Sequence, residues 1–125
     1  MSKIVHTEFV SNNPKATADF VGKMFGWKVD RMDAGNMEYY MWNYPGEKMG
    51  GGGIGATSSE HRDQVPHINI FVDVENLAKA LEKAKALGAT VLVPEMEIPN
   101  GMGYFIVLSA PGGVTIGIWS QKGSK

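Results

Sequence analysis

Hydrophobic and polar residues repeat one order of patterns twice along the chain. In each half, a strand-like stretch is followed by a stretch with apolar residues at helical spacing, and then by three more strand-like stretches. The first half covers about residues 1–58 and the second about residues 66–121, with a polar linker between them. This duplication predicts two similar βαβββ modules.

Capping and turn residues mark the elements of the first half. The strand over 4–10 is followed by a helix that should begin at Asn13-Pro14, since Asn is a good N-cap and Pro suits the first helical position. The helix should end near Gly26. Three strands are expected over 27–32, 37–44 and 50–57. The last of these is rich in glycine, which predicts that other groups approach its backbone closely.

The second half follows the same order. A strand over 66–72 precedes a helix over 73–87, and Gly88 should act as the C-terminal cap of this helix. The charged residues that should form its solvated side are Lys79, Glu82, Lys83 and Lys85. Strands are then expected over 90–93, 102–109 and 114–120.

The length of the chain suits one compact domain, residues 1–125, but each half alone has too little core to fold separately. Three strands after each helix argue against a doubly wound parallel sheet, in which helices and strands alternate throughout. We therefore expect an α+β fold in which two βαβββ modules form an incomplete barrel around a cleft. Phe20, Phe25 and Trp27 are expected in its core.

Composition limits the classes of partner. The net charge is -1 and the basic residues are scattered, so no surface for nucleic acid is predicted. The chain has no cysteine, which excludes disulfides, thiolate nucleophiles and cysteine-ligated metals. Residues 1–8 lack the apolar stretch of a signal peptide, and no apolar run approaches the roughly 20 residues that span a bilayer. We expect a cytoplasmic protein without a nucleic-acid or membrane partner.

Three local sequence patterns follow one another in the order of the duplicated elements. They are residues 6–9 (HTEF) with 25–28 (FGWK), residues 71–74 (FVDV) with 86–89 (ALGA), and residues 110–114 (APGGV) with 117–119 (GIW). With these patterns the chain resembles the vicinal oxygen chelate superfamily of glyoxalases, bleomycin resistance proteins and dioxygenases, and especially its short single-domain glyoxalase-related members. The resemblance covers nearly the whole chain and implies the paired-module fold expected above. It also implies a homodimer, in which edge strands of the modules pair.

Metal-dependent members of this superfamily take four ligands from the first and last strands of the two modules. The resemblance maps the first-strand ligands onto His6 and His67, and histidine nitrogen suits divalent metals. The last-strand ligands, usually glutamates, fall within residues 50–54 and on Gly117, where no carboxylate stands. Two imidazoles alone are an incomplete ligand set, so we expect no metal and no other cofactor. A divalent metal held by His6 and His67 is the alternative.

Strand alternation adds candidates for binding or proton transfer. His6 and Glu8 share one strand face, so Glu8 is a displaced metal ligand, a general base near His6, or a residue that only ties strands together by hydrogen bonds. His67 and Asn69 share a face of the corresponding strand in the second module. The candidates for catalysis are thus His6, Glu8 and His67.

Aromatic side chains should line part of the cleft. On the strand over 37–44, Tyr39 and Met41 share one face, and Tyr40 and Trp42 share the other. The pattern leaves open which pair lines the cleft and which packs under the helix. The ligand-binding residues that we expect are His6, Glu8, Trp42, His67, Asn69 and Tyr104.

The sequence thus predicts a small-molecule-binding protein of glyoxalase-like fold, without a metal and with a partly aromatic pocket. The alternative is a divalent-metal-dependent lyase, isomerase or dioxygenase of the glyoxalase type, in which the metal binds two neighbouring oxygens of the substrate. A third hypothesis is a metal-free enzyme that uses His6, Glu8 or His67 for proton transfer. All three place the ligand in the same cleft, so the fold does not choose among them, and enzymatic activity stays open.

Overall fold

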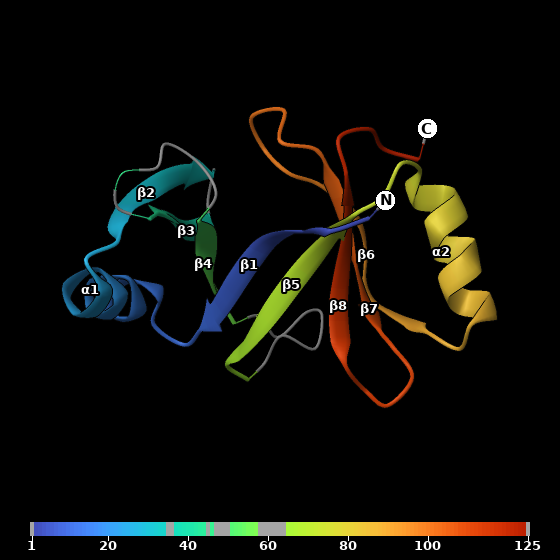
Figure 1. Ribbon diagram of the computed structural model, residues 1–125, viewed down its shortest axis with the longest axis horizontal. Helices are drawn as coiled ribbons and strands as arrows, with labels where there is room; N and C mark the ends of the chain where they lie inside the picture. Colours follow the sequence, from blue (N-terminus) through green and yellow to red (C-terminus); the bar gives the residue numbers. More distant parts are fainter. Residues whose placement is uncertain (1, 35–36, 45, 47–50, 58–64, 125) are drawn as a thin grey trace. The chain divides into compact units, whose positions relative to one another are not determined.

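The structure is a computed structural model that describes residues 2–34, 37–44, 46, 51–57 and 65–124 (Figure 1). The chain divides into two compact units. The N-terminal unit is His6–Asn69, and the C-terminal unit combines Met1–Val5 with Ile70–Lys125. Each unit holds the helix and most of the strands of one predicted module, so the predicted duplication is confirmed.

The N-terminal unit is built around the first helix. Its elements are β1 (Ile4–Ser11), whose first two residues belong to the other unit, α1 (Pro14–Phe25), β2 (Lys28–Ala34), β3 (Met37–Asn43) and β4 (Gly52–Ala56). The strand order is β2-β3-β4-β1, with β1 parallel to β4 and the other neighbours antiparallel. Asn13 caps α1 by accepting a hydrogen bond from the Ala16 N–H (3.1 Å), and Gly26 ends it with φ 73°, both as predicted.

The C-terminal unit repeats this layout. Its elements are β5 (His67–Asp73), whose first three residues belong to the N-terminal unit, α2 (Leu77–Ala86), β6 (Thr90–Glu97), β7 (Tyr104–Ser109) and β8 (Thr115–Ser120). The strand order is β5-β8-β7-β6, with β5 parallel to β8 and the other neighbours antiparallel. The α+β fold with two βαβββ modules is therefore confirmed. The cleft of an incomplete barrel involves both modules and stays a prediction.

The helix predicted over 73–87 begins later than expected. It starts at Leu77, after Asn76, whose side chain accepts a hydrogen bond from the Lys79 N–H (3.0 Å). Asp73 instead stays in β5, where its N–H donates to the Lys3 carbonyl (3.0 Å) and its carboxylate accepts from the Lys3 N–H (2.7 Å). These partners lie 70 residues away in the sequence, so local helical spacing does not reveal them.

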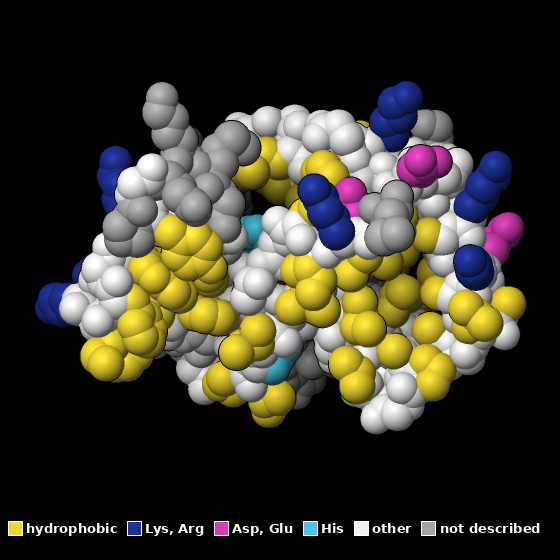
Figure 2. Space-filling model, viewed as in Figure 1, with side chains coloured by type: hydrophobic (Ala, Val, Ile, Leu, Met, Phe, Trp, Pro, Cys, Tyr) yellow, Lys and Arg dark blue, Asp and Glu magenta, His cyan; other side chains and the backbone are white. Residues whose placement is uncertain are grey.

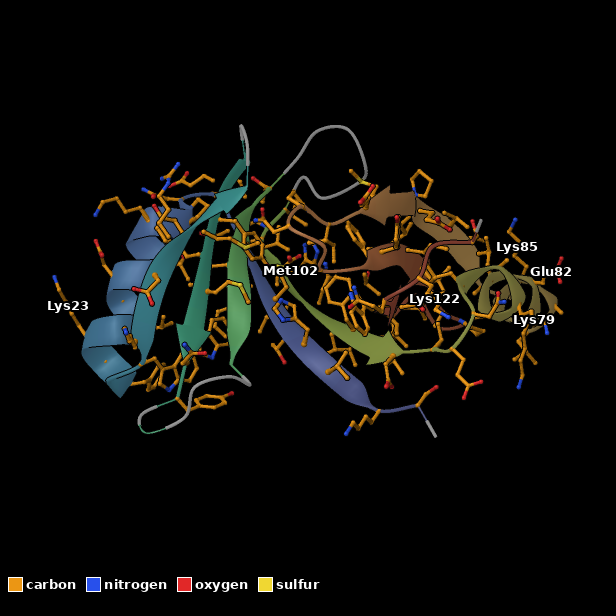
Figure 3. The ribbon with its side chains drawn as sticks, turned by 90° about the horizontal axis from the view of Figure 1, so that it is seen from above. Lys23, Lys79, Glu82, Lys85, Met102 and Lys122 are labelled. Atoms are coloured by element: carbon orange, nitrogen blue, oxygen red, sulfur yellow. The ribbon has the colours of Figure 1, made fainter. Side chains whose placement is uncertain are left out.

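The end and the outer side of α2 agree with the sequence pattern. Gly88 follows the helix with φ 100°, the left-handed conformation expected just after a helix. Figure 3 shows Lys79, Glu82 and Lys85 pointing away from the strands, as predicted for the solvated side. Among the residues that the structure describes, no helix is long and apolar enough to cross a membrane.

Core packing decides which face of β3 lies under α1. The helix packs against β2, β3 and β4, and Tyr40, Trp42 and Ile54 are buried beneath it. Trp42 is only 1% exposed, and its ring stacks on that of Trp27 with the centroids 4.8 Å apart. Because side chains alternate along a strand, Tyr39 lies on the opposite face. We call this opposite face the helix-free face of the N-terminal unit.

The sheet of the C-terminal unit carries apolar side chains on both faces. On the side of α2, the buried residues are Leu77, Ile106, Leu108 and Ile118. On the helix-free face of this unit, Phe71, Val93 and Val107 are buried, and Phe105 and Trp119 pack against them. The second face is therefore an aromatic surface that α2 does not cover.

The prediction that Phe20 and Phe25 belong to the core is wrong. Their side chains are 60% and 50% exposed, whereas Ala18 and Val21 are the α1 residues buried against the sheet. Helical spacing therefore turns Phe20 and its neighbour Met24 outward. Figure 2 shows hydrophobic side chains gathered over α1. Trp27 does pack against the core, as expected.

Two leucines of the α2 region give a test of this core. Leu77 is fully buried and Leu87 is 68% exposed. We expect Leu77→Ala to lower the free energy of unfolding by about 2–5 kcal/mol, because it leaves a cavity under α2. The matched change Leu87→Ala should stay within about 0.5 kcal/mol of the parent. Urea denaturation measures both, and equal losses would contradict this packing.

Candidate functional site

Polar side chains from two strands form a hydrogen-bonded chain on the helix-free face of the N-terminal unit. Phe9 packs on Trp42 under α1, so alternation places Glu8 and His6 of β1 on the same face as Tyr39. The Tyr39 hydroxyl donates to Glu8 Oε2 at 2.8 Å. His6 Nε2 lies 3.1 Å from the same hydroxyl oxygen. One tyrosine therefore joins the two residues that the sequence predicted together.

Glycines of β4 make this contact sterically feasible. β4 lies between β3 and β1, and Glu8 pairs with Gly53 across the β1–β4 ladder. A Cβ added at Gly53 would overlap the Tyr39 hydroxyl, and one at Gly55 would lie 3.2 Å from the Tyr39 ring. The absence of side chains at these two positions thus lets Tyr39 cross a whole strand to reach Glu8. The close approach predicted for this glycine-rich strand is confirmed.

Burial and neighbouring charge fix the protonation states of His6 and Tyr39 in this hydrogen-bonded group. Burial lowers the pKa of His6 below its ordinary value of 6.5, which favours the neutral imidazole at neutral pH. Burial, together with the charge of Glu8 and the hydrogen bond to it, raises the pKa of Tyr39 far above its ordinary value of 10.0. Tyr39 therefore keeps its proton and acts as a donor to the carboxylate.

His67 lies in another part of the N-terminal unit. Its Nδ1 is 2.8 Å from the Val65 carbonyl oxygen, so an Nδ1–H donates to that carbonyl. With Ser11, Asn13 and Thr17 it lines a shallow, open groove of about 570 Å³ whose lining includes neither Glu8 nor Tyr39. The structure therefore does not show His67 joining the hydrogen-bonded chain.

Asn69 is a buried polar residue two positions further along β5. Its side chain is 2% exposed, and within the described part of the chain Oδ1 has no hydrogen-bond partner. Leaving a buried acceptor unpaired costs free energy, so such groups are uncommon and mark places where a donor is missing. Asn69 thus remains a candidate for contact with a ligand.

Two of the expected ligand-binding residues lie on faces covered by helices. Trp42 is enclosed under α1, and Tyr104 packs with Ala80 and Leu81 in the cluster under α2. Alternation along β3 and β7 puts these side chains on the helix side, because their strand neighbours two positions away also face a helix. Trp42 and Tyr104, both predicted to bind the ligand, therefore lie outside the site proposed below.

Sequence reasoning did not assign three aromatic residues to a site. Tyr39 carries the hydrogen-bonded chain, and Phe105 and Trp119 join Phe71 on the helix-free face of the C-terminal unit. The rings of Phe71 and Phe105 form a T-shaped pair, with their centroids 5.8 Å apart. One sequence signal could have indicated Tyr39. Gly53 and Gly55, two residues apart, lie on one face of the strand next to β3, and they leave room on that face for a large side chain.

The donor set does not fit the metal site that the resemblance implies. The resemblance maps the last-strand carboxylates onto residues 50–54, which include Gly53 of β4, and onto Gly117 of β8. A side chain at Gly53 would overlap the Tyr39 hydroxyl, and one at Gly117 would overlap the Phe71 ring. The described residues contain no group of three or more His, Asp or Glu side chains able to hold a metal ion. The hydrogen-bonded group of His6, Glu8 and Tyr39 on β1 and β3 differs from the ligand set that the resemblance implies.

A protein-family model matches most of this chain. The sequence profile described as "Glyoxalase/Bleomycin resistance protein/Dioxygenase superfamily" matches residues 3–118. A search of curated proteins found no match to this sequence. The family match covers almost all of the duplicated part of the chain.

Solved structures share the fold. Methylmalonyl-CoA epimerase from Mycobacterium tuberculosis has a TM-score of 0.64 and 11% identity, with 94% of this chain and 86% of that chain covered. A superfamily member from Vibrio splendidus 12B01 has a TM-score of 0.61 and 10% identity, with 96% and 99% covered. The Mn(II)-bound glyoxalase from Novosphingobium aromaticivorans has a TM-score of 0.64 and 18% identity, with 95% and 38% covered. At these identities the likeness shows the fold alone.

A double-mutant cycle tests the crossing of β4 by Tyr39. Gly53→Ala should lower the free energy of unfolding by about 1–3 kcal/mol, because the new methyl group displaces the Tyr39 hydroxyl from Glu8 and His6. In a Tyr39→Ala background the same change should cost much less, since the overlapping ring is gone. Urea denaturation of the four proteins measures the coupling, and a cost that is equal in both backgrounds would contradict the contact.

The lowered pKa of His6 predicts a pH dependence of stability. Because the pKa is lower in the folded than in the unfolded chain, the unfolded chain binds more protons as pH falls through 6.5. The contribution of neutral His6 is present above that pH and is lost below it. His6→Gln should therefore lose less stability than the parent between about pH 7.5 and about pH 5.5. Urea denaturation at both pH values checks this, and an identical loss would refute it.

Proposed function

We propose, from the premise that the chain belongs to the Glyoxalase/Bleomycin resistance protein/Dioxygenase superfamily, that it binds a small organic molecule without a metal ion. The proposed contact surface is the helix-free face of the N-terminal unit. Its polar groups are His6, Glu8 and Tyr39, and the buried Asn69 belongs to the same unit.

The position of Tyr39 is the observation that carries this proposal. A Cβ at Gly53, one of the residues 50–54 onto which the resemblance maps a last-strand carboxylate, would overlap the Tyr39 hydroxyl. Tyr39 also donates a hydrogen bond to Glu8 Oε2, so the Glu8 carboxylate acts as an acceptor. Among these groups, the Glu8 carboxylate and Asn69 Oδ1 both accept hydrogen bonds, which favours a ligand that carries N–H or O–H donors.

Aromatic residues support a second part of the proposal. Phe105 and Trp119 are partly exposed on the helix-free face of the C-terminal unit, where they pack against the buried Phe71, and such rings stack on planar groups. This surface, considered by itself, suits a planar aromatic compound and keeps the predicted aromatic contribution to binding. A homodimer and a cytoplasmic location stay predictions.

Thermal unfolding with a panel of small phenols, aromatic acids and aromatic amines tests the proposal, with and without EDTA. A compound that raises the melting temperature equally in both conditions is the expected result. Tyr39→Phe and Glu8→Gln should weaken its binding at least about tenfold, because each removes or weakens a hydrogen bond that involves a charged group. Tyr104→Phe is the matched control, since Tyr104 packs under α2, and it should bind as the parent does.

Metal analysis of protein purified without chelators supplies the contrary outcome. A stoichiometric divalent metal that both His6→Ala and His67→Ala abolish would overturn the metal-free proposal. It would support the lyase, isomerase or dioxygenase alternative instead. Binding of the compound that Tyr39→Phe and Glu8→Gln leave unchanged would also contradict the proposed surface.

A further inference from the structure

We infer that Tyr39 is a positioning residue that selects the tautomer of His6, so that the ring proton sits on Nε2 and Nδ1 is the acceptor nitrogen. The inference deepens the proposed function, and only its consequence for a ligand rests on that function. The tautomer itself follows from three side chains of the N-terminal unit.

The first step is the direction of the two hydrogen bonds at the Tyr39 oxygen. A tyrosine hydroxyl has one proton, and an ionised carboxylate has none to give. The contact of 2.8 Å between Tyr39 and Glu8 therefore uses the hydroxyl proton. The remaining contact, 3.1 Å to His6 Nε2, can only be made to a lone pair of the hydroxyl oxygen. His6 Nε2 must then be the donor.

The second step concerns the imidazole. A neutral histidine carries a proton on one ring nitrogen only, and the partner of one nitrogen decides which. With Nε2–H donating to Tyr39, the lone pair of the ring is on Nδ1. Burial of His6 lowers its pKa and favours this neutral form.

The third step is that Tyr39 cannot easily choose another partner. Its ring lies against Gly53 and Gly55, where any Cβ would contact it. The ring is therefore guided along β4 toward β1, and the hydroxyl ends between Glu8 and His6. Glu8 accepts the hydroxyl proton of Tyr39, which leaves the hydroxyl oxygen as an acceptor. His6 therefore donates its Nε2 proton to that oxygen.

The tautomer has a consequence for the proposed ligand. In this tautomer the acceptor lone pair of the His6 ring is on Nδ1, because Nε2 is the donor to Tyr39. Tyr39 thus acts through His6 as a positioning residue, because its hydroxyl contacts Nε2 and leaves the acceptor lone pair on Nδ1. This role differs from direct contact between the Tyr39 hydroxyl and a ligand.

Long-range proton–nitrogen NMR spectra of the ¹⁵N-labelled full chain, without any ligand, test the inference near pH 7.5, well above the lowered His6 pKa. The expected result is the Nε2–H pattern for His6 in the parent protein. Glu8→Leu removes the acceptor of the tyrosine proton, so the hydroxyl should donate to Nε2 and move His6 toward the Nδ1–H form. Tyr39→Phe should bring the two nitrogen shifts closer together, because it removes the oxygen that selects one form.

Tyr40→Phe is the control, since Tyr40 faces α1 and donates to Glu38 at 2.9 Å; it should leave the His6 pattern unchanged. An Nδ1–H or doubly protonated pattern in the parent would overturn the inference. So would a His6 pattern that Glu8→Leu and Tyr39→Phe leave unaltered, or that Tyr40→Phe alters as strongly. The spectra are independent of ligand binding, so a failed compound screen with the expected spectra rejects the proposed function and leaves the tautomer assignment standing.

Discussion

The hydrogen bond from Tyr39 to Glu8 crosses a strand, and the rest of the candidate site depends on it. β3 and β1 are not neighbours, so backbone pairing cannot link these residues. A long aromatic side chain over two glycines makes the link, and its hydroxyl also meets His6. One contact thus fixes the carboxylate, orients the histidine and fills the place of a last-strand side chain. The contact requires that Gly53 and Gly55 of β4 carry no side chain.

Core and site are coupled through strand alternation. Tyr40 and Trp42 are large and become buried under α1, where Trp42 stacks on Trp27. Burial of such rings contributes on the order of a few kcal/mol each, far more than a single partly buried hydrogen bond. The apolar face of β3 therefore decides its orientation, and Tyr39 is presented on the other face as a consequence.

The sequence predicted what local chemistry determines. The caps at Asn13 and Gly26, the duplicated order of elements and the shared face of His6 and Glu8 all depend on neighbours within a few residues. It did not decide between the faces of β3, because each carries a tyrosine and an apolar partner. The delayed start of α2 escaped it as well, since Asp73 is retained in β5 by contacts with Lys3. Each of these outcomes depends on a partner distant in the sequence.

The fold is compatible with several chemistries, so the side chains must choose among them. A last-strand glycine is by itself ambiguous, because it shows only that a carboxylate is missing. The structure adds that the space is taken, by the Tyr39 hydroxyl at Gly53 and by the Phe71 ring at Gly117. Restoring a carboxylate would therefore require moving an aromatic residue in each module. Under the proposed metal-free binding, the hydrogen-bonded group of His6, Tyr39 and Glu8 would replace the chelate arrangement.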